Sequence, residues 1–239
     1  MINIKNVSKE YVEGIKAVDN LSIHIRPGEI YGFIGPNGAG KSTTIKMITG
    51  ITDYTEGEII INGVSSKEEI NSKLQFGYVS DSPDMFLKLK GVEYLNFLAT
   101  IYNVSKEEGK RRIVELAEKF ELTSALGDKI QTYSHGMRQK IMVIGALIHE
   151  PNIWILDEPL TGLDPKSSFT LKEMMKEHAR KGNSVFFSTH VLEVAEKLCD
   201  RIGIINKGKL VYEGTMEEIK ENYPNLSLEE IFLEITKDV

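Results

Sequence analysis

A glycine-rich loop between an apolar strand and a helix constrains this sequence more than any other feature. Residues 35–42 read GPNGAGKS and match the pattern Gly-x-x-x-x-Gly-Lys-Ser/Thr. The apolar run EIYGFI, 29–34, predicts a buried strand before the loop, and KSTTIKMITG, 41–50, predicts a helix after it. Glycines let backbone N–H groups approach phosphate oxygens, and a helix N-terminus adds a positive dipole. The loop therefore predicts a phosphate site that opens an α/β unit.

Two acids at the end of another strand fit the same chemistry. In such a loop Lys41 reaches the β- and γ-phosphates of a nucleotide, and the Ser42 hydroxyl holds Mg²⁺. The run PNIWILDE, 151–158, predicts an apolar strand that ends in Asp157 and Glu158. Asp157 would hold Mg²⁺ near the phosphates, and Glu158 would orient or activate the attacking water. The combination favours ATP and Mg²⁺ over the alternatives, a glycine-rich turn with a surface lysine and a solvent-facing acid pair.

The stretch YSHGMRQK, 133–140, raises the alternative of a serine hydrolase. A nucleophile elbow would read Gly-x-Ser-x-Gly, and Thr132 stands where the first glycine is required. Adjacent side chains on a helix or strand point in different directions, so His135 is badly placed as a base for Ser134. The stretch therefore needs another explanation.

Strand and helix patterns alternate along the rest of the chain. Three more runs predict strands, the last of them a hairpin: GEIIINGV at 57–64, NSVFFSTH at 183–190 and RIGIINKGKLVYEG at 201–214. From about 90 to 149 the pattern is helical. Capping boxes predict two helix starts, at Ser105 with Glu108 and at Ser227 with Glu230. The first of these helices places four apolar residues on one face: Ile113, Leu116, Ala117 and Phe120.

Composition excludes several classes of protein. The chain has 29 basic and 35 acidic residues, a net charge of −6, and no block of Lys or Arg, so no nucleic-acid partner is expected. The one cysteine, Cys199, fits a reducing compartment. The longest apolar run, 141–148, is far shorter than the ~20 residues of a membrane-spanning helix, and no secretory signal is expected.

The motifs in this order resemble those of an ATP-binding-cassette (ABC) ATPase over essentially the whole chain. They are GPNGAGKST, YSHGMRQK, WILDEPLTGLDP and FFSTH. The most diagnostic is a Ser-x-Gly signature at a helix start about 20 residues before the acidic strand, which ordinary P-loop NTPases lack. The family's usual signature is Leu-Ser-Gly-Gly-Gln, and this chain differs at Tyr133, His135 and Met137.

The resemblance implies roles for further residues. The nucleotide loop would comprise Gly35, Pro36, Asn37, Gly38, Ala39, Gly40, Lys41, Ser42 and Thr43. Ser134 and Gly136 would bind the γ-phosphate of the ATP held by the opposite subunit, where Asp164 also crosses the interface. Tyr11 would stack on adenine, and His190 would touch the γ-phosphate. Asp81 stands where the family usually has a glutamine that contacts Mg²⁺.

Four of these residues, Tyr11, Asp81, Asp164 and His190, each have a simpler structural explanation. Tyr11 could be an ordinary packing residue and Asp164 a turn residue before Pro165. His190 could be an incidental strand-end histidine, and Asp81 could lie away from the metal.

The resemblance also implies a fold. We expect a P-loop NTPase α/β core with a mostly parallel sheet, an N-terminal antiparallel β region and an inserted helical subdomain. The ATPase domain would span 1–220, with the helical insertion at about 82–149, and a short helical tail would follow at 221–239.

The implied function is ATP hydrolysis that powers a membrane transporter. Two such chains, or this chain and a paired ABC subunit, would associate head to tail around ATP. The transmembrane permease subunits would be separately encoded, so the chain would sit at the inner face of the cell membrane. The signature YSHGM and the closing SLEEIFLEI most resemble the subclass of bacterial multidrug, antibiotic or bacteriocin exporters.

Three rivals predict different sequence features. Chromosome- and repair-associated ATPases of this superfamily insert long coiled coils, for which there is no room between Lys41 and Ser134. Translation-factor ATPases generally carry two cassettes in one chain. The third is a regulatory nucleotide binder without enzymatic activity. The presence of Lys41, Asp157 and Glu158 argues against it, and an ATPase assay separates it from an enzyme.

Overall fold

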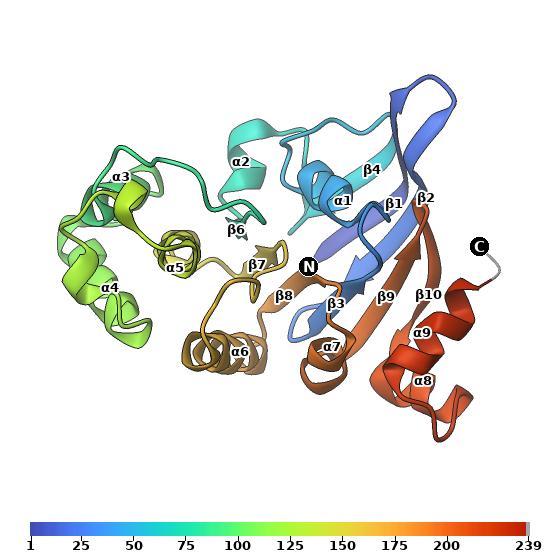
Figure 1. Ribbon diagram of the computed structural model, residues 1–239. Coiled ribbons are helices and arrows are strands. Elements are labelled where there is room, and N and C mark those ends of the chain that lie inside the picture. The colour runs from blue at the N-terminus through green and yellow to red at the C-terminus, as the bar shows by residue number, and fades with distance from the viewer. Residues whose placement is uncertain (238–239) are drawn as a thin grey trace.

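The computed structural model describes residues 1–237 and is built around two β-sheets (Figure 1). The larger sheet has six strands in the order β10-β9-β3-β8-β7-β6. All its pairs are parallel except β9 with β10, which forms the predicted hairpin. The bounds are β3 (Ile30–Ile34), β6 (Phe76–Val79), β7 (Ile153–Leu156), β8 (Ser184–Thr189), β9 (Arg201–Asn206) and β10 (Lys209–Thr215). The strands predicted from apolar runs are confirmed.

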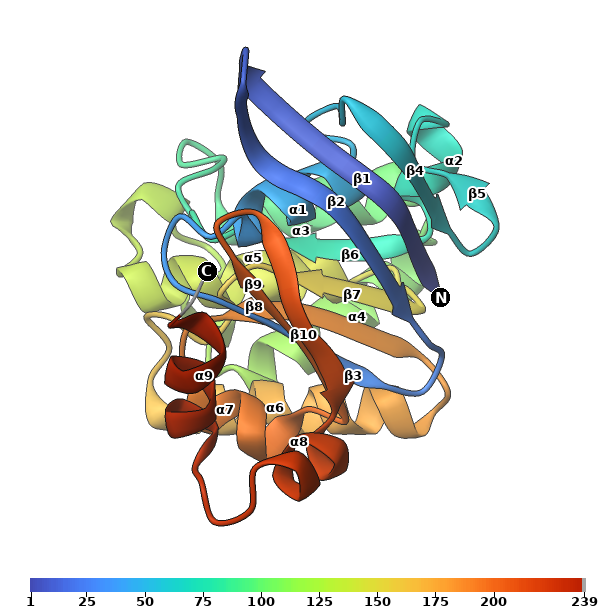
Figure 2. The same ribbon diagram turned by 90° about the vertical axis from the view of Figure 1, so that its right-hand side faces the viewer.

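The smaller sheet is antiparallel and comes almost entirely from the N-terminal part of the chain (Figure 2). Its order is β2-β1-β4-β5, with bounds β1 (Ile2–Val12), β2 (Ile15–Ile25), β4 (Glu56–Ile61) and β5 (Val64–Ser65). Asn62 and Gly63 join β4 to β5 with φ of 47° and 83°. Positive φ at both positions is what a tight two-residue hairpin turn requires, and an Asn-Gly pair adopts it readily.

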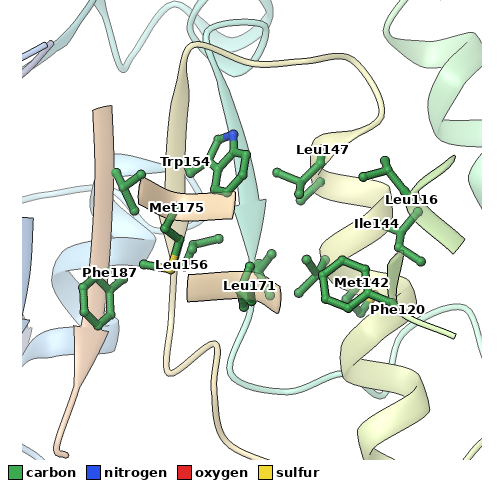
Figure 3. Packing of buried hydrophobic residues seen from close by; sticks show 14 of the residues in the cluster. Leu116, Phe120, Met142, Ile144, Leu147, Trp154, Leu156, Leu171, Met175 and Phe187 are labelled. Carbon is green, nitrogen blue, oxygen red and sulfur yellow. The ribbon is translucent and has the colours of Figure 1, made fainter. Parts of the chain in front are cut away.

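The core divides into two apolar clusters on the two faces of the six-stranded sheet. In β7, Ile153 and Ile155 belong to the cluster shared with the antiparallel sheet and α1. Trp154 and Leu156, the alternate residues, face the helices on the other side (Figure 3). Successive side chains of a strand point to opposite faces, so a strand covered on both faces is apolar throughout. This explains why β7 reads as an unbroken apolar run.

Nine α-helices are found among residues 1–237, and three of them form a lobe beside the sheets (Figure 1, green to yellow). The three are α3 (Gly91–Ile101), α4 (Lys106–Lys119) and α5 (His135–Leu147), which contact one another. The others are α1 (Lys41–Ile48), α2 (Glu69–Lys73), α6 (Pro165–Arg180), α7 (Leu192–Leu198), α8 (Met216–Asn222) and α9 (Leu228–Thr236), with short 3₁₀ turns at Thr123–Ala125 and Ile130–Thr132.

The two predicted capping boxes have different outcomes. At α9 the Ser227 side chain and the Glu230 carboxylate cap each other's backbone N–H groups, as predicted. At α4 Ser105 accepts a hydrogen bond from the Glu108 N–H, but the Glu108 carboxylate does not return to Ser105. The reciprocal box was therefore a wrong prediction.

The Glu108 carboxylate instead receives hydrogen bonds from Arg111 and Arg112, one turn further along α4. Those bonds lower the pKa of Glu108 to about 2. The apolar face predicted for this helix is confirmed, since its four residues are all buried: Ile113, Leu116, Ala117 and Phe120.

None of the helices in residues 1–237 is both long enough and apolar enough to cross a bilayer. The C-terminal tail expected at 221–239 extends two residues beyond the described part of the chain. Its described part contains α9, whose Leu228 and Ile231 are buried against the rest of the protein.

Candidate active site

The glycine-rich loop lies at the C-terminal end of β3 and leads directly into α1. Gly40, the residue before α1, has φ of 111°, and an added Cβ there would lie 2.7 Å from the carbonyl oxygen of Ala17. That position accepts only glycine because both its dihedral and its space exclude a side chain. The close approach to Ala17 also sets β2 of the antiparallel sheet beside the loop.

Lys41 turns its ammonium group back over this loop. Its Nζ donates hydrogen bonds to the carbonyl oxygens of Gly35, at 2.7 Å, and Pro36, at 3.1 Å. The side chain is only 6% exposed, and Nζ lies 3.6 Å from Oε1 of Glu158. The lysine of the loop and the acid predicted at the end of β7 therefore meet in space, 117 residues apart in sequence (158 − 41).

Asp157 is completely buried at the end of β7. Its Oδ1 accepts a hydrogen bond of 2.6 Å from the Ser188 hydroxyl, while Oδ2 has no hydrogen-bond partner. Burial raises the pKa of this carboxyl, the hydroxyls of Ser188 and Ser42 act in the opposite direction, and the charges of Asp81 and Glu158 raise it further. A buried carboxylate oxygen without a partner is a place where a cation can bind.

Glu158 is held in a left-handed backbone conformation, with φ of 48°. Its N–H donates to the Ser188 hydroxyl at 3.0 Å. Oε2 lies 3.0 Å from Nδ1 of His190, which follows β8, and Oε1 faces Lys41. The structure thus brings together Lys41, Glu158 and His190 from three separate segments.

Asp81 follows β6 at the same edge of the sheet. It is exposed and accepts a hydrogen bond of 3.2 Å from the Ser80 hydroxyl. Asp81 lies near enough to Asp157 for its charge to raise the pKa of the Asp157 carboxyl. The carboxyl ends of β6 and β7 are also joined by the hydrogen bond from the Asp157 N–H to the Val79 carbonyl oxygen, at 2.9 Å. Asp81 therefore stands beside the acids at the end of β7.

The signature residues lie at the start of α5. Ser134 is the N-cap of that helix, and its exposed hydroxyl accepts a hydrogen bond of 3.3 Å from the Met137 N–H. An added Cβ on Gly136 would lie 2.7 Å from the Gly162 carbonyl oxygen, and one on Gly162 would lie 2.3 Å from the His135 ring. The start of α5 therefore packs tightly on the loop between β7 and α6. Within residues 1–237, no hydrogen bond or ion pair joins Ser134 or Gly136 to the glycine-rich loop.

Asp164 and Tyr11 lie away from that cluster. Asp164 is the N-cap of α6, bonding the Ser167 N–H at 2.9 Å, and it pairs with Lys140 of α5 at 2.7 Å. These contacts, with Lys140 the largest, hold the pKa of Asp164 well below its usual range. Tyr11, near the tip of the β1–β2 hairpin, is 57% exposed, with Lys9 Nζ 4.9 Å from its ring centroid. Its ring is therefore not part of the apolar core.

From the sequence we predicted no role for Lys140 or Ser188, which both contact residues of the proposed site. Lys140 holds Asp164, and Ser188 contacts both acids at the end of β7. The signal for Ser188 was present in the run NSVFFSTH, where a hydroxyl interrupts a strand buried on both faces. A buried polar side chain of this kind requires a hydrogen-bond partner.

We expect a fluorophosphonate, a reagent for nucleophilic serines, to leave Ser134 unlabelled. The Ser134 hydroxyl caps a helix, and no hydrogen bond joins it to a histidine or carboxylate anywhere in residues 1–237. An unactivated hydroxyl is a weak nucleophile. Peptide mass spectrometry measures the adduct, with a known serine hydrolase in the same reaction as the positive control. Covalent labelling at Ser134 would restore the serine-hydrolase hypothesis.

Known proteins resemble this chain in both sequence and architecture. A family model described as ABC transporter matches residues 18–161. The linearmycin resistance ATP-binding protein LnrL of Bacillus subtilis (strain 168) is 38% identical over 221 residues, which are 92% of this chain and 70% of that protein.

Two solved structures resemble the whole fold. One, described as the structure of an ATP binding subunit of an ABC transporter, has a TM-score of 0.93 and 34% identity over 99% of each chain. The other is the dimeric post-hydrolysis state of the ATP-binding cassette MJ0796 bound to ADP and Pi. Its TM-score is 0.83 and its identity 28%, over 90% of this chain and 99% of that one. The extent of these matches shows that the chain belongs to the ABC transporter family, as an ATP-binding subunit that hydrolyses ATP.

Proposed function

We propose that the chain is the ATPase subunit of an exporter and that its catalytic residues are those at the end of β7 and β8. The meeting of Lys41, Glu158 and His190 is the observation that carries the assignment. Lys41 binds the β- and γ-phosphates on the loop of Gly35 to Thr43. Glu158 orients or activates the attacking water, and His190 holds the Glu158 carboxylate and touches the γ-phosphate.

Mg²⁺ would bind at the end of β7 together with the nucleotide. The residues fit the ion, because Asp157 offers a buried oxygen without a partner and the Ser42 hydroxyl lies near the same carboxyl. Within the described residues, no group of three or more His, Cys, Asp or Glu side chains could hold a metal by itself. Mg²⁺ usually takes one or two protein ligands along with phosphates and water. Asp81, beside Asp157, would contact the ion directly or through water.

Head-to-tail association would supply the remaining contacts. Ser134 and Gly136 lie at the N-terminus of α5, where exposed N–H groups favour an anion. Within residues 1–237 no hydrogen bond or ion pair joins them to the loop of their own chain, so we assign them to the γ-phosphate held by a second ABC subunit. Asp164, exposed at the start of α6, would cross the same interface, and Tyr11 would stack on adenine. The dimeric MJ0796 cassette bound to ADP and Pi supports this assembly.

The direction of transport that we propose is export. The similarity to a linearmycin resistance ATP-binding protein supports it, because resistance to a compound fits its removal from the cell. The partner would be a separately encoded transmembrane permease, which would hold this chain at the inner face of the cell membrane. Co-purification from native membranes tests this assignment. Recovery of a transmembrane chain whose deletion increases sensitivity to a toxic compound supports export, and recovery of an uptake permease contradicts it.

We also propose a division of the chain into parts. One ABC ATPase unit spans 1–220 with a helical insertion at about 82–149, to which α3, α4 and α5 belong. A helical tail follows. The boundary expected at 220/221 falls inside α8, near the end of that helix.

The permease would dock in the cleft around Asp81, between the core and the helical insertion. A cavity of about 240 Å³ lies near this cleft, and Asp81 does not line it. Its lining comes from the end of α1 and from α2, β6, α3 and α5: Thr49, Ile51, Lys73, Phe76, Tyr78, Tyr94, Leu98, Tyr102, Gly145 and Ala146. Phe86 lies beside it, with its ring 5.1 Å from that of Tyr94. Met85 and Phe86 are 50% and 40% exposed. Apolar side chains exposed together on a loop indicate a surface that another molecule covers.

Replacing Phe86 by serine should release the chain from membranes or uncouple transport. The ring is partly exposed, so basal ATPase activity should stay near wild type and the thermal midpoint should fall by no more than about 2–4 °C. Membrane fractionation, ATPase activity and thermal unfolding measure the three effects.

Phe169→Ser is the matched control, because that phenylalanine is 64% exposed on α6 and does not line the cavity. It should remain on the membrane. A large loss of stability in Phe86→Ser would show that Phe86 belongs to the core, and the docking proposal would fail.

A further inference from the structure

A single buried hydroxyl on β8 connects the two acids of the site. Ser188 is fully buried, and its hydroxyl lies 2.6 Å from Oδ1 of Asp157 and 3.0 Å from the backbone nitrogen of Glu158. The two acids are on β7 and the turn after it, while Ser188 is on the neighbouring strand. β8 lies between β7 and β3, which ends at the glycine-rich loop, so Ser188 sits between the acids and the loop strand.

The direction of both hydrogen bonds follows from the chemistry of the groups. A backbone N–H can only donate, so the Ser188 oxygen must accept from Glu158. The single hydroxyl proton is then available for Asp157, whose ionised carboxylate can only accept. The hydroxyl therefore donates its single proton to Asp157 and accepts the Glu158 N–H with one of its two lone pairs.

Each bond fixes something that catalysis needs. The bond to Oδ1 holds the rotation of the Asp157 carboxylate, and Oδ2 is the oxygen left without a partner. The bond from the Glu158 N–H holds a backbone at φ of 48°, a conformation that costs free energy for any residue other than glycine. That turn directs the Glu158 carboxylate toward Lys41 and His190.

We propose that Ser188 is a positioning residue for the ATPase reaction. It sets the metal-facing oxygen of Asp157 and the backbone turn of Glu158 through one hydroxyl group. The inference rests on the proposed roles of those two acids, but it can fail while they stand. In that case Ser188 would be a buried strand residue that satisfies its own hydroxyl, and its loss would lower stability without changing the metal or the chemistry.

The threonine and valine variants at this position isolate the hydroxyl. The two side chains have nearly the same shape, and only threonine keeps the donor and acceptor. The affinity for AMP-PNP, a non-hydrolysable ATP analogue, is measured by calorimetry with Mg²⁺ and again with EDTA. The ratio of the two affinities reports the contribution of the metal. Steady-state kcat and KM for ATP are measured on the same variants.

We expect the metal-free affinity to be the same in both variants. The Mg²⁺-dependent gain is the ratio of the AMP-PNP affinity with Mg²⁺ to that with EDTA. It should be on the order of 10- to 100-fold smaller in Ser188→Val than in Ser188→Thr, which is the loss typical of a hydrogen bond to a charged group. kcat should fall in the valine variant by more than KM changes, because the turn that carries Glu158 is no longer held.

Ser184→Ala is the control for a general loss of a buried hydroxyl in β8. Ser184 is buried at the other end of the strand, where its hydroxyl donates to the Arg26 carbonyl oxygen at 2.9 Å. It should lose stability without a change in the Mg²⁺-dependent gain. Equal gains in the threonine and valine variants would overturn the proposal. If the added methyl group prevents both from folding, Ser188→Ala against wild type decides by the same ratio. Failure of the proposed site itself would instead appear as a wild-type protein with no Mg²⁺-dependent gain.

Discussion

Glu158→Gln is expected to stop ATP turnover while leaving ATP binding largely intact. Removing a general base lowers a rate by roughly 10²- to 10⁴-fold, so hydrolysis should fall by at least about 100-fold. The amide keeps the size of the carboxylate between Lys41 and His190, and the phosphate contacts of the loop are untouched. Phosphate release measures the rate, and calorimetry measures ATP affinity.

Because ATP remains bound, Glu158→Gln should also accumulate as an ATP-bound dimer on size-exclusion chromatography. Glu193→Gln on α7 is a suitable control, since its side chain is 74% exposed and pairs with Lys197 on the same helix. That variant should hydrolyse ATP normally and show no excess dimer. Wild-type turnover in Glu158→Gln would refute the role assigned to this residue.

Lys41→Ala should weaken nucleotide binding itself. The Lys41 ammonium is the charged donor of the loop, and the substitution removes its contacts with the β- and γ-phosphates. Charge-assisted hydrogen bonds of this kind contribute about 1.5–3 kcal/mol each, so ATP affinity should fall by about 10- to 100-fold or more. Calorimetry with ATP in EDTA measures the affinity without interference from hydrolysis.

Lys46→Ala distinguishes the loss of a phosphate contact from the loss of one positive charge on α1. Lys46 is in the last turn of the same α1, so its removal changes the net charge equally but leaves the loop intact. It should bind ATP with wild-type affinity. Thermal unfolding of Lys41→Ala is needed as well, because the carbonyl oxygens of Gly35 and Pro36 lose a donor. Unchanged ATP affinity in a folded Lys41→Ala protein would count against the phosphate-loop assignment.

Local patterns explain why so much of the fold could be predicted from the sequence. A strand covered on both faces is largely apolar, so β3, β7 and β8 were visible as short apolar runs. The Asn62–Gly63 turn and the hairpin of β9 and β10 have turn residues at fixed places. In the loop, Gly40 is required by its own φ and by the carbonyl oxygen of Ala17. These features depend on a few neighbouring residues, and the sequence contains them directly.

The predicted capping box at α4 failed because two arginines of the same helix, Arg111 and Arg112, take the Glu108 carboxylate. Ser105 with Glu108 satisfies the pattern, but Arg112 also bonds the Ile148 carbonyl oxygen and pairs with Glu150. That anchoring holds the guanidinium in place for the Glu108 carboxylate. A charged hydrogen bond from Arg is stronger than one from a backbone N–H, so Glu108 pairs with the arginines.

The sequence by itself determined the family motifs, the strands that form short apolar runs, and which acids, lysine and histidine we propose for the site. Only the tertiary structure decided how they meet: which oxygen of Asp157 lacks a partner, how Glu158 lies between Lys41 and His190, and that Ser188 contacts both acids. The physical reason is the strand order β3-β8-β7, which sets segments more than 100 residues apart side by side. Hydrogen bonds across strands depend on that order and register, and no spacing within one segment determines either.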